Sequence, residues 1–193
     1  NMQRAKGYIV RGSSNYSMPA TNINATFTGV PHNGNIPFTI SRGSYTGVPY
    51  NGTNGIQITN INDNYNLIGN PYPSAIDAEE FLAANTYHAT TNPTGVIYGN
   101  VKLWTHGYQP AAIVNPFYGS FAYNYNANDY VTLNYLGASD PIGASNIIKS
   151  GQAFFVQMVD GTTGTGNVNF SNSMRLDASN NSYNNSGFFR TST

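Results

Sequence analysis

Apolar and polar residues alternate with a period of two in many short segments, which is typical of β-strands with one buried face. Glycine, proline and asparagine cluster between these segments and mark turns. The expected strands span residues 7–12, 36–40, 56–61, 65–68, 95–98, 101–105, 119–125, 130–135, 153–159 and 167–170. Many short strands with few helices predict a mainly β fold, an antiparallel β-sandwich or jelly-roll-like domain.

One segment, residues 75–84, has the pattern of a short helix instead. Ser74 stands at the N-cap position and Asp77 follows three residues later, a spacing that resembles a capping box. Two glutamates in the expected first turn suit the positive end of the helix dipole. Asn85 is expected to end the helix.

The sequence Thr-Gly-Val-Pro-x-Asn-Gly occurs twice, at residues 28–34 and 46–52, with an aromatic residue before each copy. Each copy ends in Asn-Gly, the dipeptide that suits the central positions of a type I′ turn. The repeat therefore predicts two similar β units with equivalent corners. Two copies are too few for a solenoid.

The chain of 193 residues is long enough for one sizeable core, so a single β-sandwich domain over residues 1–175 is the simplest organisation. Asparagine and serine become denser over residues 176–193, where we expect a loop or linker. The chain begins at Asn1 and shows no signal peptide, so we interpret it as a piece of a longer protein.

Composition narrows the classes of function. Only 8% of the residues are charged, against about 25% in a typical soluble domain, and 29 residues are asparagine. The formal net charge of +0 disfavours a nucleic-acid partner, which usually requires a basic surplus. No apolar run approaches the ~18–20 residues that cross a bilayer, so we expect no membrane insertion. The chain has no cysteine, which excludes disulfides and thiolate metal sites.

Catalytic and metal-binding patterns are weak. The histidines at 32, 88 and 106 are far apart and lack metal-ligand spacing, and no serine lies in a Gly-x-Ser-x-Gly context. Helix capping accounts for the acidic cluster around Asp77, whereas a glycosidase needs two carboxylates that face each other. Residues 124–129 offer alternate oxygen side chains for Ca²⁺, without the glycine bend or bidentate glutamate of a calcium loop. We therefore expect no enzymatic activity, no metal and no cofactor.

Four longer motifs occur in order, at residues 66–77 (NLIGNPYPSAID), 103–106 (LWTH), 148–156 (IKSGQAFFV) and 168–175 (VNFSNSMR). Together they resemble the extracellular β-rich domain of large secreted and cell-surface proteins of Bacteroidetes-type bacteria. The resemblance implies an adhesin-like or structural role, an extracellular or cell-surface location and export by type IX secretion. It implies no known reaction.

Aromatic side chains on or near expected strands are the candidate ligand-binding residues, together with one histidine. They are Trp104, His106, Tyr123, Tyr125 and Tyr135. The spacing of Tyr123 and Tyr125 places both on one strand face. Such a row, with asparagine and threonine around it, can stack on sugar rings and bind hydroxyl groups. The same row can equally pack in a sandwich core or in a protein interface, where tyrosine is favoured.

Two hypotheses for the function follow from these observations. The leading one is a non-enzymatic structural or adhesin module of a larger bacterial surface protein, acting through self-association or surface attachment. Its partners would be other copies of itself or other surface proteins, because a nearly uncharged surface favours association. The alternative is a carbohydrate-binding module that holds a polysaccharide on an exposed aromatic strip.

Overall fold

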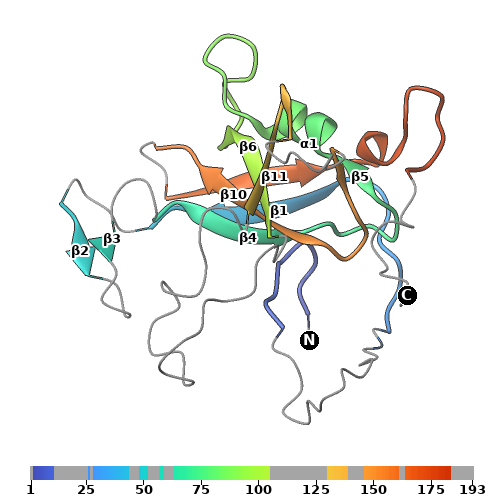
Figure 1. Cartoon of the computed structure of the whole chain (residues 1–193), viewed down its shortest axis with the longest axis horizontal. Helices are drawn as coiled ribbons and strands as arrows, with labels where there is room; N and C mark the ends of the chain where they lie inside the picture. The colour runs from blue at the N-terminus through green and yellow to red at the C-terminus, as the bar shows by residue number, and fades with distance from the viewer. Residues whose placement is uncertain are drawn as a thin grey trace.

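The fold is described from a computed structural model, which defines residues 2–10, 26, 28–43, 48–51, 57–58, 63–104, 130–138, 146–160 and 164–183. Its largest element is an antiparallel five-stranded sheet with the strand order β4-β10-β6-β7-β8. Figure 1 labels three of these strands, β4, β6 and β10. The strands are β4 (Tyr65–Gly69), β6 (Ile97–Trp104), β7 (Tyr130–Asn134), β8 (Gly137–Ala138) and β10 (Ala153–Met158).

A second antiparallel sheet pairs two strands from opposite ends of the chain, β1 (Ile36–Ser41) and β11 (Thr165–Phe170). Two shorter antiparallel pairs join β2 (Tyr50–Asn51) to β3 (Gln57–Ile58) and β5 (Ile76–Asp77) to β9 (Ile147–Ile148). Asn66 links the two main sheets, because its side-chain amide donates to the Ser41 carbonyl at 2.7 Å and its Oδ1 accepts from the Ser41 N–H at 3.0 Å.

The core lies between the two main sheets, because each strand turns alternate side chains inward. On β10 every second residue is buried, while the residues between them are partly exposed. The residues of the two main sheets in one continuous cluster are Ile36, Ile40, Ile68, Ile97, Val101, Leu103, Val131, Leu133, Phe154, Val156, Met158, Val168 and Phe170. The predicted fold, mainly β, antiparallel and sandwich-like with one short α-helix, is confirmed in the described residues.

The helix α1 spans Ala78–Asn85, so it begins three residues later than the pattern predicts. Asp77 is the N-cap, and its Oδ1 accepts from the Glu79 N–H at 2.7 Å. The prediction of Ser74 as the cap is wrong, because residues 76–77 are already paired as strand β5. The hydroxyl of Ser74 instead accepts a hydrogen bond from Arg175 Nε at 2.7 Å. Asn85 ends the helix, as predicted.

Helix α1 holds the two sheets together through one aromatic side chain. Phe81 is fully buried, and its ring centroid lies 5.3 Å from that of Phe154 on β10 and 5.0 Å from that of Phe170 on β11. Both distances fall in the range in which aromatic pairs attract each other beyond simple area burial. The helix therefore belongs to the core.

Three predicted strands differ from the structure. Residues 97–98 and 101–104 of the predicted segments 95–98 and 101–105 lie on the single strand β6, because Asn100 continues the ladder opposite Asn134. Within 7–12, the described residues 7–10 form no strand, although the preceding Lys6 makes an isolated bridge to Ile68. Segment 119–125 lies outside the described residues.

The two copies of the repeat have different surroundings, which corrects the expectation of equivalent corners. In the first copy only Gly34 has a positive φ, 80°, so the type I′ turn predicted there is wrong. This corner instead meets the core, because Tyr72 donates its hydroxyl to the Gly34 carbonyl at 2.6 Å. The second copy contributes β2, which pairs with the nearby β3.

The chain beyond β11 continues along the helix side of the sandwich. It forms a 3₁₀ helix, η3 (Asn172–Arg175), and the Tyr183 hydroxyl then donates to Oδ2 of Asp77 at 2.9 Å. Burial, and next the hydrogen bond to Asp77, raise the pKa of Tyr183 to about 12. The domain boundary at residue 175 stays a prediction, but residues 176–183 are tied to the start of α1 by this contact.

Candidate ligand-binding face

The side of the five-stranded sheet that faces away from the core carries large polar and aromatic side chains. One row crosses four strands, because Phe155 on β10 lies opposite Leu67 on one side and Lys102 on the other, and Lys102 lies opposite Thr132. The next row places Trp104 opposite Tyr130. Regular alternation along each strand therefore brings these groups to one surface.

This surface is hollowed into two adjoining open depressions of about 590 and 410 Å³. They share Tyr65, Lys102 and Thr132, so we treat them as one outer groove. The outer groove is lined by Tyr65, Tyr98, Gly99, Asn100, Lys102, Tyr130, Thr132, Asn134, Phe155, Gln157 and Asp160.

Aromatic rings form one part of the outer groove. Tyr130 and Phe155 meet edge to face, with ring centroids 5.9 Å apart and planes at 71°. Trp104, the neighbour of Tyr130 across the ladder, has 41% of its surface exposed, and Tyr98 has 39%. Large apolar side chains exposed together on one face are characteristic of binding surfaces.

Lys102 lies at the centre of the outer groove, within the row of Phe155 and Thr132. Its Nζ donates to the Tyr65 hydroxyl at 2.8 Å and lies 4.9 Å from the centroid of the same ring. The second distance is within the range of a cation–π contact. One tyrosine therefore holds the ammonium group in place.

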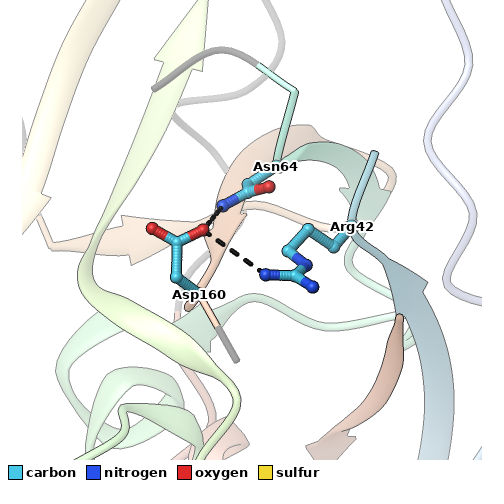
Figure 2. Close-up of polar contacts among 3 residues, drawn as sticks. All are labelled: Arg42, Asn64 and Asp160. Atoms are coloured by element: carbon cyan, nitrogen blue, oxygen red, sulfur yellow. Dashed lines mark hydrogen bonds and ion pairs between the residues drawn. The ribbon is translucent and has the colours of Figure 1, made fainter. Parts of the chain in front are cut away.

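The polar end of the outer groove is built around Asp160 (Figure 2). Its Oδ1 accepts from Nδ2 of the fully buried Asn64 at 2.9 Å and lies 3.8 Å from Nη1 of Arg42. The ion pair is long and partly exposed, and such pairs contribute about 0–1 kcal/mol. The hydrogen bond from Asn64 therefore does most to orient the carboxylate.

The structure places one of the predicted binding residues on this face. Trp104 lies there and is exposed opposite Tyr130, whereas Tyr135, which is 50% exposed, follows the end of β7 and does not line the outer groove. His106, Tyr123 and Tyr125 lie outside the described residues, so their assignment stays a prediction.

Sequence reasoning missed four central residues of the outer groove, namely Tyr65, Tyr98, Lys102 and Phe155. Each lies on a segment predicted as a strand, and the alternation within a strand separates its two faces. Assigning one face of each strand to a common surface also requires the strand order β4-β10-β6-β7. That order joins segments far apart in the sequence.

Two carboxylates in the described part of the chain, those of Asp77 and Asp160, have structural partners. Asp77 is used by helix α1 and Tyr183, and Asp160 by Asn64 and Arg42. No three His, Asp, Glu or Cys side chains within the described ranges gather closely enough to hold a metal ion. Among the helices that the structure describes, none is long and apolar enough to span a membrane.

These features define an antiparallel β-sandwich-like domain with an open aromatic and amide-lined groove on one sheet. The chain belongs to the DUF8693 family, described as a domain of unknown function, whose family model matches residues 1–193. No curated protein and no solved structure matches the chain significantly.

Proposed function

We propose that the chain is a non-enzymatic attachment module of an extracellular bacterial surface protein and that its outer groove binds a polysaccharide. The observation that supports this proposal is the composition of the groove on the outer face of the five-stranded sheet. Aromatic rings alternate there with the amides of Asn100, Asn134 and Gln157. The role as an adhesin-like surface module rests on the family resemblance of the sequence motifs.

The chemistry of the outer groove suits a sugar chain. A sugar ring has apolar C–H faces, which pack on aromatic rings, and hydroxyl groups, which need hydrogen-bonding partners. An amide side chain both donates and accepts hydrogen bonds, so it can satisfy a hydroxyl group in either role. The open shape of the groove also suits a polymer, because a chain can lie along it without being enclosed at its ends.

The single tryptophan of the chain provides a direct test, because Trp104 is exposed beside the outer groove. Titration with a panel of soluble polysaccharides should give a saturable change in tryptophan emission for at least one polymer. Tyr98→Ala should weaken that binding by about three- to tenfold, the equivalent of one aromatic contact of about 1 kcal/mol. Isothermal titration calorimetry should rank the affinities of the unmodified chain and Tyr98→Ala in the same order.

Tyr87→Ala is the matched control, because Tyr87 is exposed and lies outside the outer groove. It should bind as the unmodified chain does. The proposal fails if no polysaccharide binds, or if Tyr98→Ala and Tyr87→Ala bind equally well.

Self-association is a second candidate function, and the repeat supplies the observation that favours it. Val30 and Val48 occupy the same position in the two copies, and they are 85% and 71% exposed. Exposed apolar side chains at equivalent positions are suited to contacts between copies, although single exposed valines are common on protein surfaces. A partner of this kind would be another copy of the chain or another surface protein.

A further inference from the structure

The positive charge of Lys102 distinguishes the outer groove from a neutral sugar-binding surface. Within the described part of the chain, no carboxylate pairs with this lysine, whose hydrogen bond goes to the neutral hydroxyl of Tyr65. An ammonium group has three donors, so two remain after that hydrogen bond. Its charge therefore has no matching anion among these residues.

Asp160, the acidic residue that lines the outer groove, does not supply that anion. Its Oδ1 is engaged by Asn64 and lies near Arg42, as Figure 2 shows. Within the described residues no ion pair joins Asp160 to Lys102, which leaves the charge of Lys102 without a carboxylate partner in the groove. A ligand with a negative group near Lys102 would therefore be complementary in charge to the groove.

The surroundings of Lys102 favour a strong contact with such a group. The side chain is half-buried, and Phe155 and Tyr65 lie beside it, which lowers the local dielectric relative to bulk water. The Tyr65 hydroxyl and ring already hold the ammonium group, so less side-chain entropy is lost when an anion binds.

From this geometry we infer that the outer groove selects an acidic polysaccharide, with a carboxylate on the sugar bound by Lys102. The inference rests on the proposed polysaccharide-binding function and adds the substrate class. The sugar ring packs on the aromatic part of the groove, and its carboxylate accepts hydrogen bonds from the ammonium group.

A matched pair of polymers tests the inference without changing the protein. Polygalacturonate carries a carboxylate on each sugar, and its methyl ester has the same backbone without the charge. Tryptophan titration should give about tenfold tighter binding of polygalacturonate, the size expected for one hydrogen bond to a charged group. That preference should shrink between about 0.01 M and about 1 M NaCl, because salt screens the charge pair.

Lys102→Gln should remove the preference while retaining binding of the methyl ester, because the aromatic part of the outer groove is unchanged. Lys6→Gln is the control, since it removes the same charge from an exposed side chain outside the groove. It should keep the full preference for the acidic polymer. Circular dichroism of both variants should match that of the unmodified chain.

Several outcomes would overturn the inference and leave the proposed function standing. These are equal binding of the two polymers, binding of neutral polysaccharides alone, or an unchanged preference in Lys102→Gln. Equally tight binding of dextran sulfate would overturn the assignment of a carboxylate, because any anion would then suffice. Failure of every polysaccharide, acidic or neutral, would overturn the proposed function as well.

Discussion

Asparagine supplies the three polar residues that are buried in the described part of the chain, Asn64, Asn70 and Asn85. A buried polar group is costly unless it is hydrogen-bonded, and a buried charge costs far more. The asparagine amide both donates and accepts without a charge, and the amides of Asn70 and Asn85 pair in this way with backbone groups inside the core. The high asparagine content thus has a structural use in this chain.

Asn85 shows how such a residue joins two elements. Its Nδ2 donates to the carbonyls of Phe81 and Asn169, and its Oδ1 accepts from the Asn169 N–H at 2.6 Å. Asn169 lies on β11, so the amide fastens the end of helix α1 to the two-stranded sheet. This contact is absent from any local sequence pattern, because its partners are 84 residues apart.

We expect Asn85→Ala to lower the free energy of unfolding by about 2 kcal/mol, because it leaves buried backbone groups unpaired. Asn85→Asp should cost more at neutral pH, since it places a carboxylate oxygen against two carbonyls. The loss in free energy of unfolding caused by Asn85→Asp should be smaller in acid, where the carboxyl group is protonated and can donate a hydrogen bond. Urea denaturation of the variants at neutral and acidic pH measures these effects.

Asn167→Asp is the control for this comparison. Asn167 lies on β11, the strand that Asn85 contacts, but it is exposed, and its Oδ1, which aspartate retains, accepts from the Thr39 hydroxyl. Its unfolding free energy should change little. Equal losses in Asn85→Asp and Asn167→Asp would contradict a special role for the buried amide.

Helix α1 and the segment after β11 stabilise each other through the pair of Asp77 and Tyr183. The pKa of Tyr183 is raised from 10.0 to about 12, so folding favours its protonated form. The stabilisation is therefore fully present below the unfolded pKa of 10.0. It is lost as the pH rises through about 12.

The free energy of unfolding should fall as the pH rises from 10.0 to about 12, and Tyr183→Phe should make this fall smaller. Urea denaturation at closely spaced pH values measures this slope. The burial of Tyr72 also raises its pKa, against the effect of nearby Arg175, so a part of the slope should remain. An identical pH profile in Tyr183→Phe and the unmodified chain would contradict the assignment.

Elements that depend on local patterns were predicted best. Strand β1 and strand β10 follow their alternation closely, and the helix ends at Asn85 as expected. The predicted N-cap was wrong because residues 76–77 pair with β9. Because of this tertiary contact, the helix begins only at Ala78. The predicted break inside β6 is absent because β7 continues the ladder past it.

At the scale of the whole molecule, low charge allows contacts between copies that salt hardly screens. We expect weak, concentration-dependent self-association in sedimentation velocity experiments, with little change between about 0.1 M and about 1 M NaCl. The double variant Val30→Ser and Val48→Ser should reduce it. Leu136→Ser is the control, because Leu136 is 97% exposed but lies outside the repeat. A monomer at high concentration, or an equal effect of both changes, would contradict the expectation.

The alternation of apolar and polar residues by itself predicted most of the strands, and the capping pattern predicted the short helix. These properties are local, since each depends on side chains a few residues apart. The tertiary structure decided which strands are neighbours, and so which side chains share the outer groove. Tyr65, Lys102 and Phe155 meet there because β4, β6 and β10 are adjacent in the sheet. Backbone hydrogen bonds between distant segments set that adjacency, and no periodicity within one segment encodes it.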